Sequence, residues 1–304
     1  MGNNRSALGL IFLLSTSAIW GISYIFTKIA VQSIPPMTLA SIRFFLASLI
    51  LSLFALKKRK RGFFLSKDAA LSGLFGVTLY FFFENYSLKL TNPSDAALIV
   101  SSAPILAIVF YDMLERHFNI IEYIGSISAF VGLFFVIYGG QFSEGSSIFG
   151  NIIAFGAAIS WVGYTYFFEK HSNSTTSGTL AISLWGMIFT IPIAIFEIFV
   201  LKMPVSFNPG AITGILYLSI LASALGYFMW GMGIKLWGGK YSTIWIYTIP
   251  IFTVFADVVF LKNVPTFFFY LGASLVATGM ILVIIQRFKN IRGYEENLST
   301  QSRR

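Results

Sequence analysis

The sequence predicts an all-α integral membrane protein with ten transmembrane helices, arranged as two inverted five-helix repeats. Three observations predict this fold. Of the 304 residues, 56% are hydrophobic and only 11% are charged, whereas a soluble domain carries roughly 25% charged residues. The chain contains ten apolar runs long enough to cross a bilayer, and features of its first half recur in its second half at a nearly constant spacing. A soluble fold of this size would need a polar surface that this composition does not supply.

Each apolar run matches the roughly 20 residues that a helix needs to cross the hydrocarbon core. Membrane-barrel strands are a poor alternative, because their spans take about ten residues and alternate polar with apolar. The first run is longer than the roughly 7–15 apolar residues of a signal peptide and no small-residue cleavage site follows it, so it is interpreted as a span. The ten runs are 8–31, 37–56, 69–88, 96–114, 120–138, 148–168, 179–201, 211–234, 241–261 and 266–285.

Basic residues predict the orientation, because loops rich in Lys and Arg stay in the cytoplasm. With both termini inside, 16 of the 21 Lys and Arg residues are cytoplasmic, four are outside, and Arg43 lies within a span. The net charge of +9 therefore indicates contact with a lipid bilayer and not with nucleic acid. We expect a multi-pass protein of the cell membrane with both termini in the cytoplasm.

The internal repeat is visible as residues that recur 146 or 147 positions apart, with a shorter spacing at the start of each half. Because a five-helix unit crosses the membrane an odd number of times, the second copy must be inverted. The predicted domains are the repeats 1–143 and 144–286 and a basic cytoplasmic tail, 287–304. Inverted repeats are typical of transporters whose halves open alternately to either side. The recurring pairs are Lys89 and Lys235, Pro104 and Pro250, Gly125 and Gly272, Gly132 and Gly279, and Trp20 and Trp161.

Several positions occur in the order and spacing of a known family. They are Trp20-Gly21 with Lys28 eight residues after the tryptophan, Arg43, Pro104 followed by Glu115, Gly125, Gly132, Trp161, Pro250, Gly272 and Gly279. In this the whole chain resembles the EamA-type proteins of the drug/metabolite transporter superfamily. It departs at Leu261-Lys262, where the family often has an acid. The resemblance implies ten helices in two repeats of five, and export of amino acids or related metabolites without nucleotide hydrolysis.

The residues themselves disfavour other functions. The segment from Gly238 to Ser242 lacks the spacing of a phosphate-binding loop, so neither a nucleotide nor a cofactor is expected. His117 and His171 lie near interfaces and the acids do not cluster, which disfavours a metal site or an enzyme. The inverted repeat predicts a secondary transporter that works by alternating access. The resemblance adds that it exports a small-molecule substrate such as an amino acid or related amphipathic compound. Another drug or metabolite class stays open as an alternative, and a membrane-embedded enzyme or a channel is less favoured.

Glu84 is the first candidate for substrate binding. It lies about two-thirds of the way along the third run, where a charge costs roughly 2.5–3.5 kcal/mol and is expected to face the interior of the bundle. It can bind a substrate ammonium group or exchange a proton, which leaves proton coupling open. The equal alternative is a structural pair with Arg43 or Lys89. Arg43 can hold a substrate carboxylate, although tethering to a helix-end carbonyl, Glu84 or Asp257 is favoured.

Aromatic residues supply the other candidates. Tyr80 and Glu84 share a helix face by their spacing of four residues, and the repeat places Trp230 on the equivalent face of the eighth run. Aromatic walls with one acid suit an amphipathic ligand, including one with an ammonium group. Packing and interfacial positions are the alternative. The substrate-binding candidates are Glu84, Tyr80, Trp20, Tyr24, Trp161, Tyr164, Trp230 and Ser101.

Pro104 and Pro250 are predicted hinges. Each lies within a span, where proline removes one backbone hydrogen bond and kinks the helix. Broken helices at matching positions of two halves point to a binding site, while kinking for packing is the equal alternative. Among the remaining acids, Asp112, Glu115 and Glu169 are expected at the cytoplasmic interface, where a gate salt bridge is one alternative, and Glu197 is expected at the rim.

Overall fold

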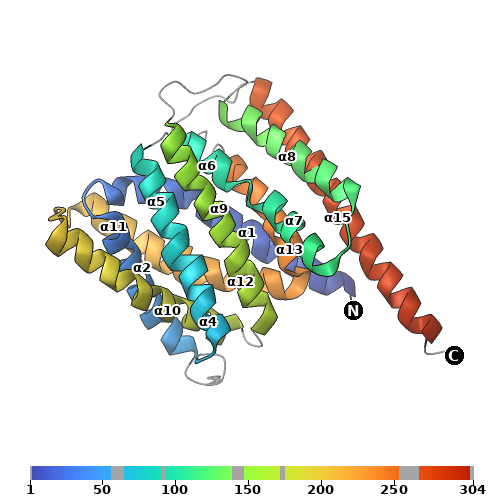
Figure 1. Cartoon of the computed structure of the whole chain (residues 1–304), viewed down its shortest axis with the longest axis horizontal. Coiled ribbons are helices and arrows are strands. Elements are labelled where there is room, and N and C mark those ends of the chain that lie inside the picture. The colour runs from blue at the N-terminus through green and yellow to red at the C-terminus, as the bar shows by residue number, and fades with distance from the viewer. Residues whose placement is uncertain are drawn as a thin grey trace.

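The structure is a computed structural model that describes residues 2–55, 65–90, 93–138, 147–171, 175–252 and 267–301, and every regular element in these ranges is helical. Figure 1 shows a bundle of long helices, with α8 and α15 side by side at one edge. The elements are α1 (Gly2–Val31), α2 (Pro36–Ala55), α4 (Lys67–Gly73), η1 (Leu74–Leu79), α5 (Tyr80–Leu90), α6 (Pro93–Val100), α7 (Ala103–Glu115), α8 (Ile120–Tyr138), α9 (Ile148–His171), α10 (Thr175–Ile195), η2 (Phe196–Val200), α11 (Pro209–Tyr217), η3 (Leu218–Leu225), α12 (Gly226–Trp237), α13 (Gly239–Ser242), η4 (Thr243–Thr248) and α15 (Phe267–Gln301).

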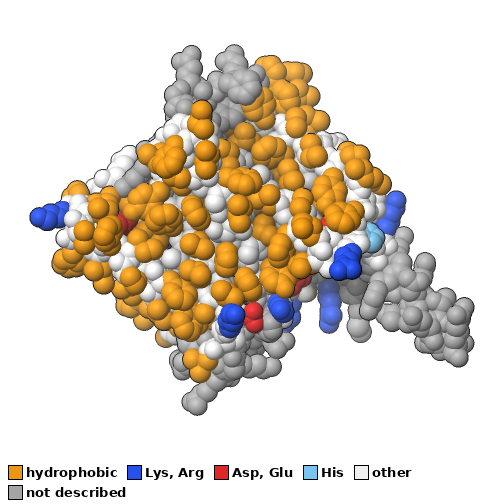
Figure 2. All heavy atoms as spheres, in the orientation of Figure 1, with side chains coloured by type: hydrophobic (Ala, Val, Ile, Leu, Met, Phe, Trp, Pro, Cys, Tyr) orange, Lys and Arg blue, Asp and Glu red, His pale blue; other side chains and the backbone are white. Residues whose placement is uncertain are grey.

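Within the described ranges, eight helices are long and apolar enough to cross a membrane. They match all the predicted runs except the third and the ninth. Hydrophobic side chains cover most of the face seen in Figure 2, and Lys and Arg side chains lie near its margins. A surface of this kind is suited to lipid contact. The chain is therefore an all-helical, multi-pass membrane protein.

The two remaining runs differ from the eight in separate ways. Run 69–88 is helical throughout, within the stretch α4–η1–α5, but polar residues such as Glu84 and Asn85 lower its mean hydropathy. Run 241–261 begins in α13 and η4, and its part beyond residue 252 lies outside the described residues. A total of ten spans stays a prediction.

The contact between α8 and α15 relates the two halves of the chain. A Cβ on Gly125 would lie 2.6 Å from the Gly279 carbonyl oxygen, and one on Gly132 would lie 2.7 Å from that of Gly272. Glycine is needed here because the backbones approach closely. Applying the repeat spacing exchanges the two contacts, since Gly125 corresponds to Gly272 and Gly132 to Gly279. Reciprocal contacts of this kind are typical of a two-fold axis.

Irregular helical turns also occur at matching positions. The π-helical segment η1 maps, by the spacing of 146, into the π-helical segment η3. Pro104 is the second residue of α7 and follows the turn that ends α6, while Pro250 follows the 3₁₀ segment η4. Such departures from α-helix are frequent at functional sites and hinges. The hinge role of both prolines stays a prediction.

The two ends of the bundle can be identified by the hydrogen bonds that join chain segments there. The Trp237 indole donates to the Ser6 carbonyl at 2.9 Å, so α12 ends beside the beginning of α1. We call this the N-terminal end of the bundle. At the opposite end, the Asn208 amide donates to the Ser33 hydroxyl at 2.7 Å, which joins the start of α11 to the residues that follow α1.

Candidate functional site

The predicted tryptophans meet in the core of the bundle. Trp20 of α1 lies 5.1 Å from Trp161 of α9 and 5.2 Å from Trp230 of α12, measured between ring centroids. Trp161 in turn lies 5.0 Å from Tyr164 and 5.2 Å from Tyr80. With Tyr227, these rings form the central aromatic cluster, which comprises Trp20, Tyr80, Trp161, Tyr164, Tyr227 and Trp230. All but Tyr80 are at most 9% exposed.

Two glycines make room for the rings of this cluster. A Cβ on Gly226 would lie 2.7 Å from the Trp20 indole nitrogen, and one on Gly76 would lie 2.6 Å from the Tyr164 ring. The Trp20 indole donates to the Ala222 carbonyl at 3.0 Å in η3, and the Tyr227 hydroxyl donates to the Gly76 carbonyl at 2.6 Å in η1. The two π-helical segments therefore anchor the cluster from both halves of the chain.

Glu84 lies at the edge of this cluster and is 7% exposed. The Tyr80 hydroxyl donates to the Glu84 carboxylate at 3.0 Å, which confirms that the two side chains share a face. Tyr24 of α1 is a second polar neighbour of this carboxylate. Among the side chains that the structure describes, no Lys or Arg nitrogen forms an ion pair with this carboxylate; the Lys89 side chain is not among them. Within the described part of the chain, the acid is thus held by the Tyr80 phenol.

Arg43 lies near the same carboxylate without pairing with it. Its Nε donates to the Ser223 hydroxyl at 2.8 Å, and its guanidinium carbon lies 4.4 Å from the Phe81 ring centroid. The guanidinium is 4% exposed and is stabilised by the aromatic face. Asp257, its other predicted partner, lies outside the described residues. Arg43 keeps an electrostatic attraction to Glu84, so the two opposite charges border one region of the core.

Three donors of the aromatic cluster are buried without a hydrogen-bond partner in the described structure. They are the indole nitrogens of Trp161 and Trp230 and the hydroxyl of Tyr164. A buried polar group left unpaired costs roughly 1–3 kcal/mol, so each such group calls for an explanation. Trp161 contacts Tyr80, whose hydroxyl donates to Glu84, while Trp230 and Tyr164 contact Trp161 in turn. The unpartnered donors are therefore linked to the buried acid by contacts between rings.

Ser101 is placed differently from the other candidates. It is buried at the turn between α6 and α7, just before Pro104. No described hydrogen bond joins Ser101 to the central aromatic cluster. The structure thus brings seven of the eight substrate-binding candidates together, and leaves Ser101 at the interruption of the helix. Tyr227 also lies in the cluster but was not predicted. It corresponds to Phe81 at the repeat spacing of 146, so the repeat argument that identified Trp230 could also have identified Tyr227.

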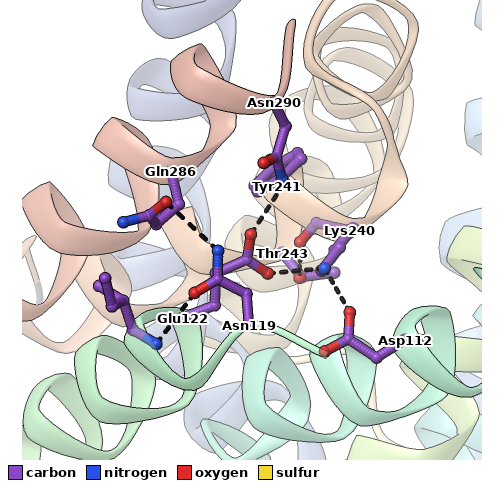
Figure 3. Close-up of polar contacts among 9 residues, drawn as sticks. Asp112, Asn119, Glu122, Lys240, Tyr241, Thr243, Gln286 and Asn290 are labelled. Atoms are coloured by element: carbon purple, nitrogen blue, oxygen red, sulfur yellow. Dashed lines mark hydrogen bonds and ion pairs between the residues drawn. The ribbon is translucent and has the colours of Figure 1, made fainter. Parts of the chain in front are cut away.

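A buried group of charges lies at the N-terminal end of the bundle (Figure 3). The Lys240 ammonium of α13 lies 2.5 Å from a carboxylate oxygen of Asp112 and 2.6 Å from one of Glu122. We call these three residues the lysine cluster. Burial disfavours the charged lysine, but the bonds to Asp112 and Glu122 outweigh burial and raise the pKa of Lys240. Asp112 was expected at this interface, while Lys240 as its partner was missed.

At the opposite end of the bundle, the structure contradicts the predicted position of Glu197. It was expected at the rim, but it is fully buried. Its carboxylate accepts hydrogen bonds from the backbone N–H groups of Met37 at 3.0 Å and Thr38 at 2.9 Å, and from the Tyr86 hydroxyl at 3.1 Å. The first N–H groups of a helix have no partner within it and attract an anion. Glu197 therefore caps α2, which it approaches from η2.

Comparisons with known proteins agree with this architecture. The sequence model of the EamA-like transporter family matches the chain twice, at residues 7–138 and 148–285. An uncharacterized transporter of Archaeoglobus fulgidus is 28% identical, over 90% of this chain and 96% of its own. A Salmonella typhimurium protein named probable amino-acid metabolite efflux pump is 23% identical, over 87% of this chain and 90% of its own. One crystal structure shares the fold at a TM-score of 0.75 and 17% identity, over 93% of this chain and 98% of its own.

Proposed function

Because the chain belongs to the EamA-like transporter family and is a membrane transporter, we propose that it is a secondary transporter that exports a small amphipathic metabolite, an amino acid or related compound. The relative named for amino-acid metabolite efflux supports this substrate class. Transport proceeds by alternating access, in which the two repeats open in turn to either side of the membrane. The boundaries of the repeats, near residue 143 and residue 286, belong to the same proposal.

The observation that carries the proposal is the state of Glu84. Its carboxylate is buried and accepts a hydrogen bond from the Tyr80 hydroxyl, with no ion pair to a described Lys or Arg side chain. An acid at this depth in a membrane protein is costly unless it serves a ligand, a proton or a cation. A substrate ammonium group bound here would have Glu84 as its counter-ion and the rings of Tyr80 and Trp161 as its walls.

Other side chains of the site are suited to the carboxylate and the apolar part of such a substrate. The unpartnered indole N–H groups of Trp161 and Trp230 are donors for a carboxylate or carbonyl oxygen, and Arg43 supplies a positive charge. The apolar part of the molecule would pack on the aromatic rings. If the substrate leaves with exchange of a proton at Glu84, transport is coupled to the proton gradient.

The proposed orientation places both termini, and hence the N-terminal end of the bundle, in the cytoplasm. The chain has no cysteine, so single introduced cysteines can be labelled without background. Ser206 and His117 are exposed at opposite ends of the bundle. In intact cells, an impermeant maleimide should label Ser206→Cys and should not label His117→Cys. The reverse pattern would invert the orientation.

Transport of radiolabelled amino acids into proteoliposomes tests the proposed function. The purified protein should give saturable uptake of at least one amino acid, and unlabelled substrate inside the vesicles should accelerate it by exchange. Protein-free vesicles provide the background. Folded protein that transports no amino acid in a complete panel would contradict the proposed substrate class.

A further inference from the structure

The lysine cluster holds three charged side chains where water does not reach. Lys240 is 6% exposed, and Asp112 and Glu122 are fully buried. Removing charges from water is so costly that replacing a buried ion pair by apolar residues is often neutral or stabilising. The cluster is therefore poorly explained as a device for stability alone. Buried charges are better explained where they select one of two arrangements.

The cluster connects the two halves of the chain. Asp112 of α7 and Glu122 of α8 belong to the first half, and Lys240 of α13 belongs to the second. The Tyr241 hydroxyl adds a bond to Glu122 at 3.0 Å and accepts one from the Asn290 amide of α15 at 3.0 Å. Figure 3 shows these side chains converging from α7, α8, α13 and α15. Separating the halves at this end requires that the bonds to Lys240 break.

The segment that carries Lys240 begins at a joint. Gly238, between α12 and α13, has a φ of 82°, a left-handed conformation that glycine adopts readily. The Gly239 N–H donates to the Glu169 carboxylate at 2.7 Å, and the Tyr111 hydroxyl donates to the same carboxylate at 2.6 Å. The short α13 is thus bound to α7, α8 and α9 by side chains, while its backbone connection to α12 is the pair Gly238-Gly239, and glycine has the widest choice of backbone conformations.

The opposite end has no equivalent of the cluster in sequence. By the spacing of 146, Lys240 corresponds to Ser94 and Asp112 to Val258; by the spacing of 147, Glu122 corresponds to Phe269. In a transporter built from two inverted repeats, closure at either end would use equivalent residues if the symmetry were complete. Among the residues that the structure describes, the ion pairs lie in the lysine cluster, at the N-terminal end.

We propose that the lysine cluster is a lock that holds the two halves together at the N-terminal end and that opens once in each transport cycle. Opening separates Lys240 from Asp112 and Glu122 and lets water reach the core from this end, as α13 moves about Gly238. The lock rests on the proposed alternating-access function. The lock goes beyond that function, because it names the bonds that must break. Neither membership of the family nor the central site identifies those bonds.

Thiol labelling tests the lock without knowledge of the substrate. Ser126 of α8 is one turn deeper than Glu122 and is 1% exposed. In a Ser126→Cys variant in lipid nanodiscs, where both faces meet the reagent, a water-soluble maleimide should react slowly. Adding Lys240→Met should raise the rate at least about tenfold, as expected when the closed state loses about 1.4 kcal/mol of stabilisation. Lys235→Met is the matched control, because Lys235 is exposed on the neighbouring α12 and should leave the rate unchanged.

A second variant covers the case in which Lys240→Met does not fold, since it leaves two buried acids without their cation. Asp112→Asn/Glu122→Gln/Lys240→Met removes all three charges at similar volume and should also raise the Ser126→Cys rate. A Ser206→Cys reporter at the opposite end should not respond to either variant. Unchanged Ser126→Cys labelling in a folded variant, or an equal rise with Lys235→Met, would overturn the lock. Because labelling needs no substrate, a failed amino-acid panel would leave this result standing.

Discussion

The two ends of the bundle each contain a buried acid that joins the two halves, yet they are built from different partners. At the N-terminal end, Glu122 and Asp112 pair with the side chain of Lys240. At the opposite end, Glu197 accepts from backbone N–H groups at the start of α2. The lysine cluster joins side chains of α7, α8 and α13, whereas Glu197 binds the backbone at the start of α2. The comparison therefore separates a side-chain contact that we propose to break during transport from a helix cap that holds η2 to α2.

The largest effect is expected at this helix cap. Glu197→Ala leaves the N–H groups of Met37 and Thr38 buried without an acceptor, which should lower the free energy of unfolding by about 3 kcal/mol. The melting temperature of the purified protein measures this loss. Glu115→Ala, a change of an exposed acid, is the control and should have little effect. Equal melting temperatures for both variants would remove the distinction between the ends.

The glycine contact between α8 and α15 should rank second. Gly125→Ala places a Cβ 2.6 Å from the Gly279 carbonyl oxygen, which the helix pair can relieve only by moving apart. Such overpacking should cost about 1–3 kcal/mol. A Cβ at Gly210 would meet the Ile29 Cγ2 methyl at 3.1 Å and the Asn208 Oδ1 at 3.4 Å, and no backbone atom, so Gly210→Ala is the matched control. If both alanines are tolerated equally, the close two-fold contact is not a constraint on the fold.

A smaller difference is expected between two tryptophans of the central aromatic cluster. Trp20→Phe removes an indole that donates to the Ala222 carbonyl, whereas Trp161→Phe removes one without a partner. Both create a similar cavity, so Trp20→Phe should be less stable by the value of one hydrogen bond, about 1 kcal/mol. Chemical or thermal unfolding of the two variants measures the difference. A greater loss for Trp161→Phe would mean that its N–H has a structural partner.

The smallest change in stability is expected at the lock. Asp112→Asn/Glu122→Gln/Lys240→Met should stay within about 1 kcal/mol of the parent protein, because neutral side chains of similar volume avoid the desolvation of three charges. Its melting temperature can be compared directly with that of Glu197→Ala. A fall in melting temperature as large as that of Glu197→Ala would show that the lysine cluster serves to stabilise the fold.

Much of this architecture can be predicted from the sequence, because hydrophobic runs and basic loops are local signals. Eight of the predicted runs are spans by length and composition, and the i, i+4 spacing of Tyr80 and Glu84 predicted a contact that is present. The repeat spacing also led from Glu84 to Trp230, which lies in the central aromatic cluster. Run 69–88, which polar residues dilute, is helical as predicted, and its crossing of the membrane stays a prediction.

The contacts at the two ends could not be predicted in the same way. Glu197 lies 160 residues from Met37, and Lys240 lies 128 residues from Asp112. A charge near the end of an apolar run has the same local pattern whether it faces water or caps a buried helix. The π-helical segments were also missed, because no simple residue pattern distinguishes them from α-helix. Their matching positions in the two halves are visible only in the folded chain.

The central claim is that Glu84 binds the substrate, and transport by Glu84→Gln tests it most directly. The substitution keeps the volume of the side chain and its contact with Tyr80 while it removes the charge. Uptake into proteoliposomes, normalised to folded protein, should fall at least about tenfold, since a charged contact worth about 1.4 kcal/mol or more is lost. The melting temperature should change little. Uptake at the level of the parent protein, with a lowered melting temperature, would contradict the account and leave Glu84 a structural residue.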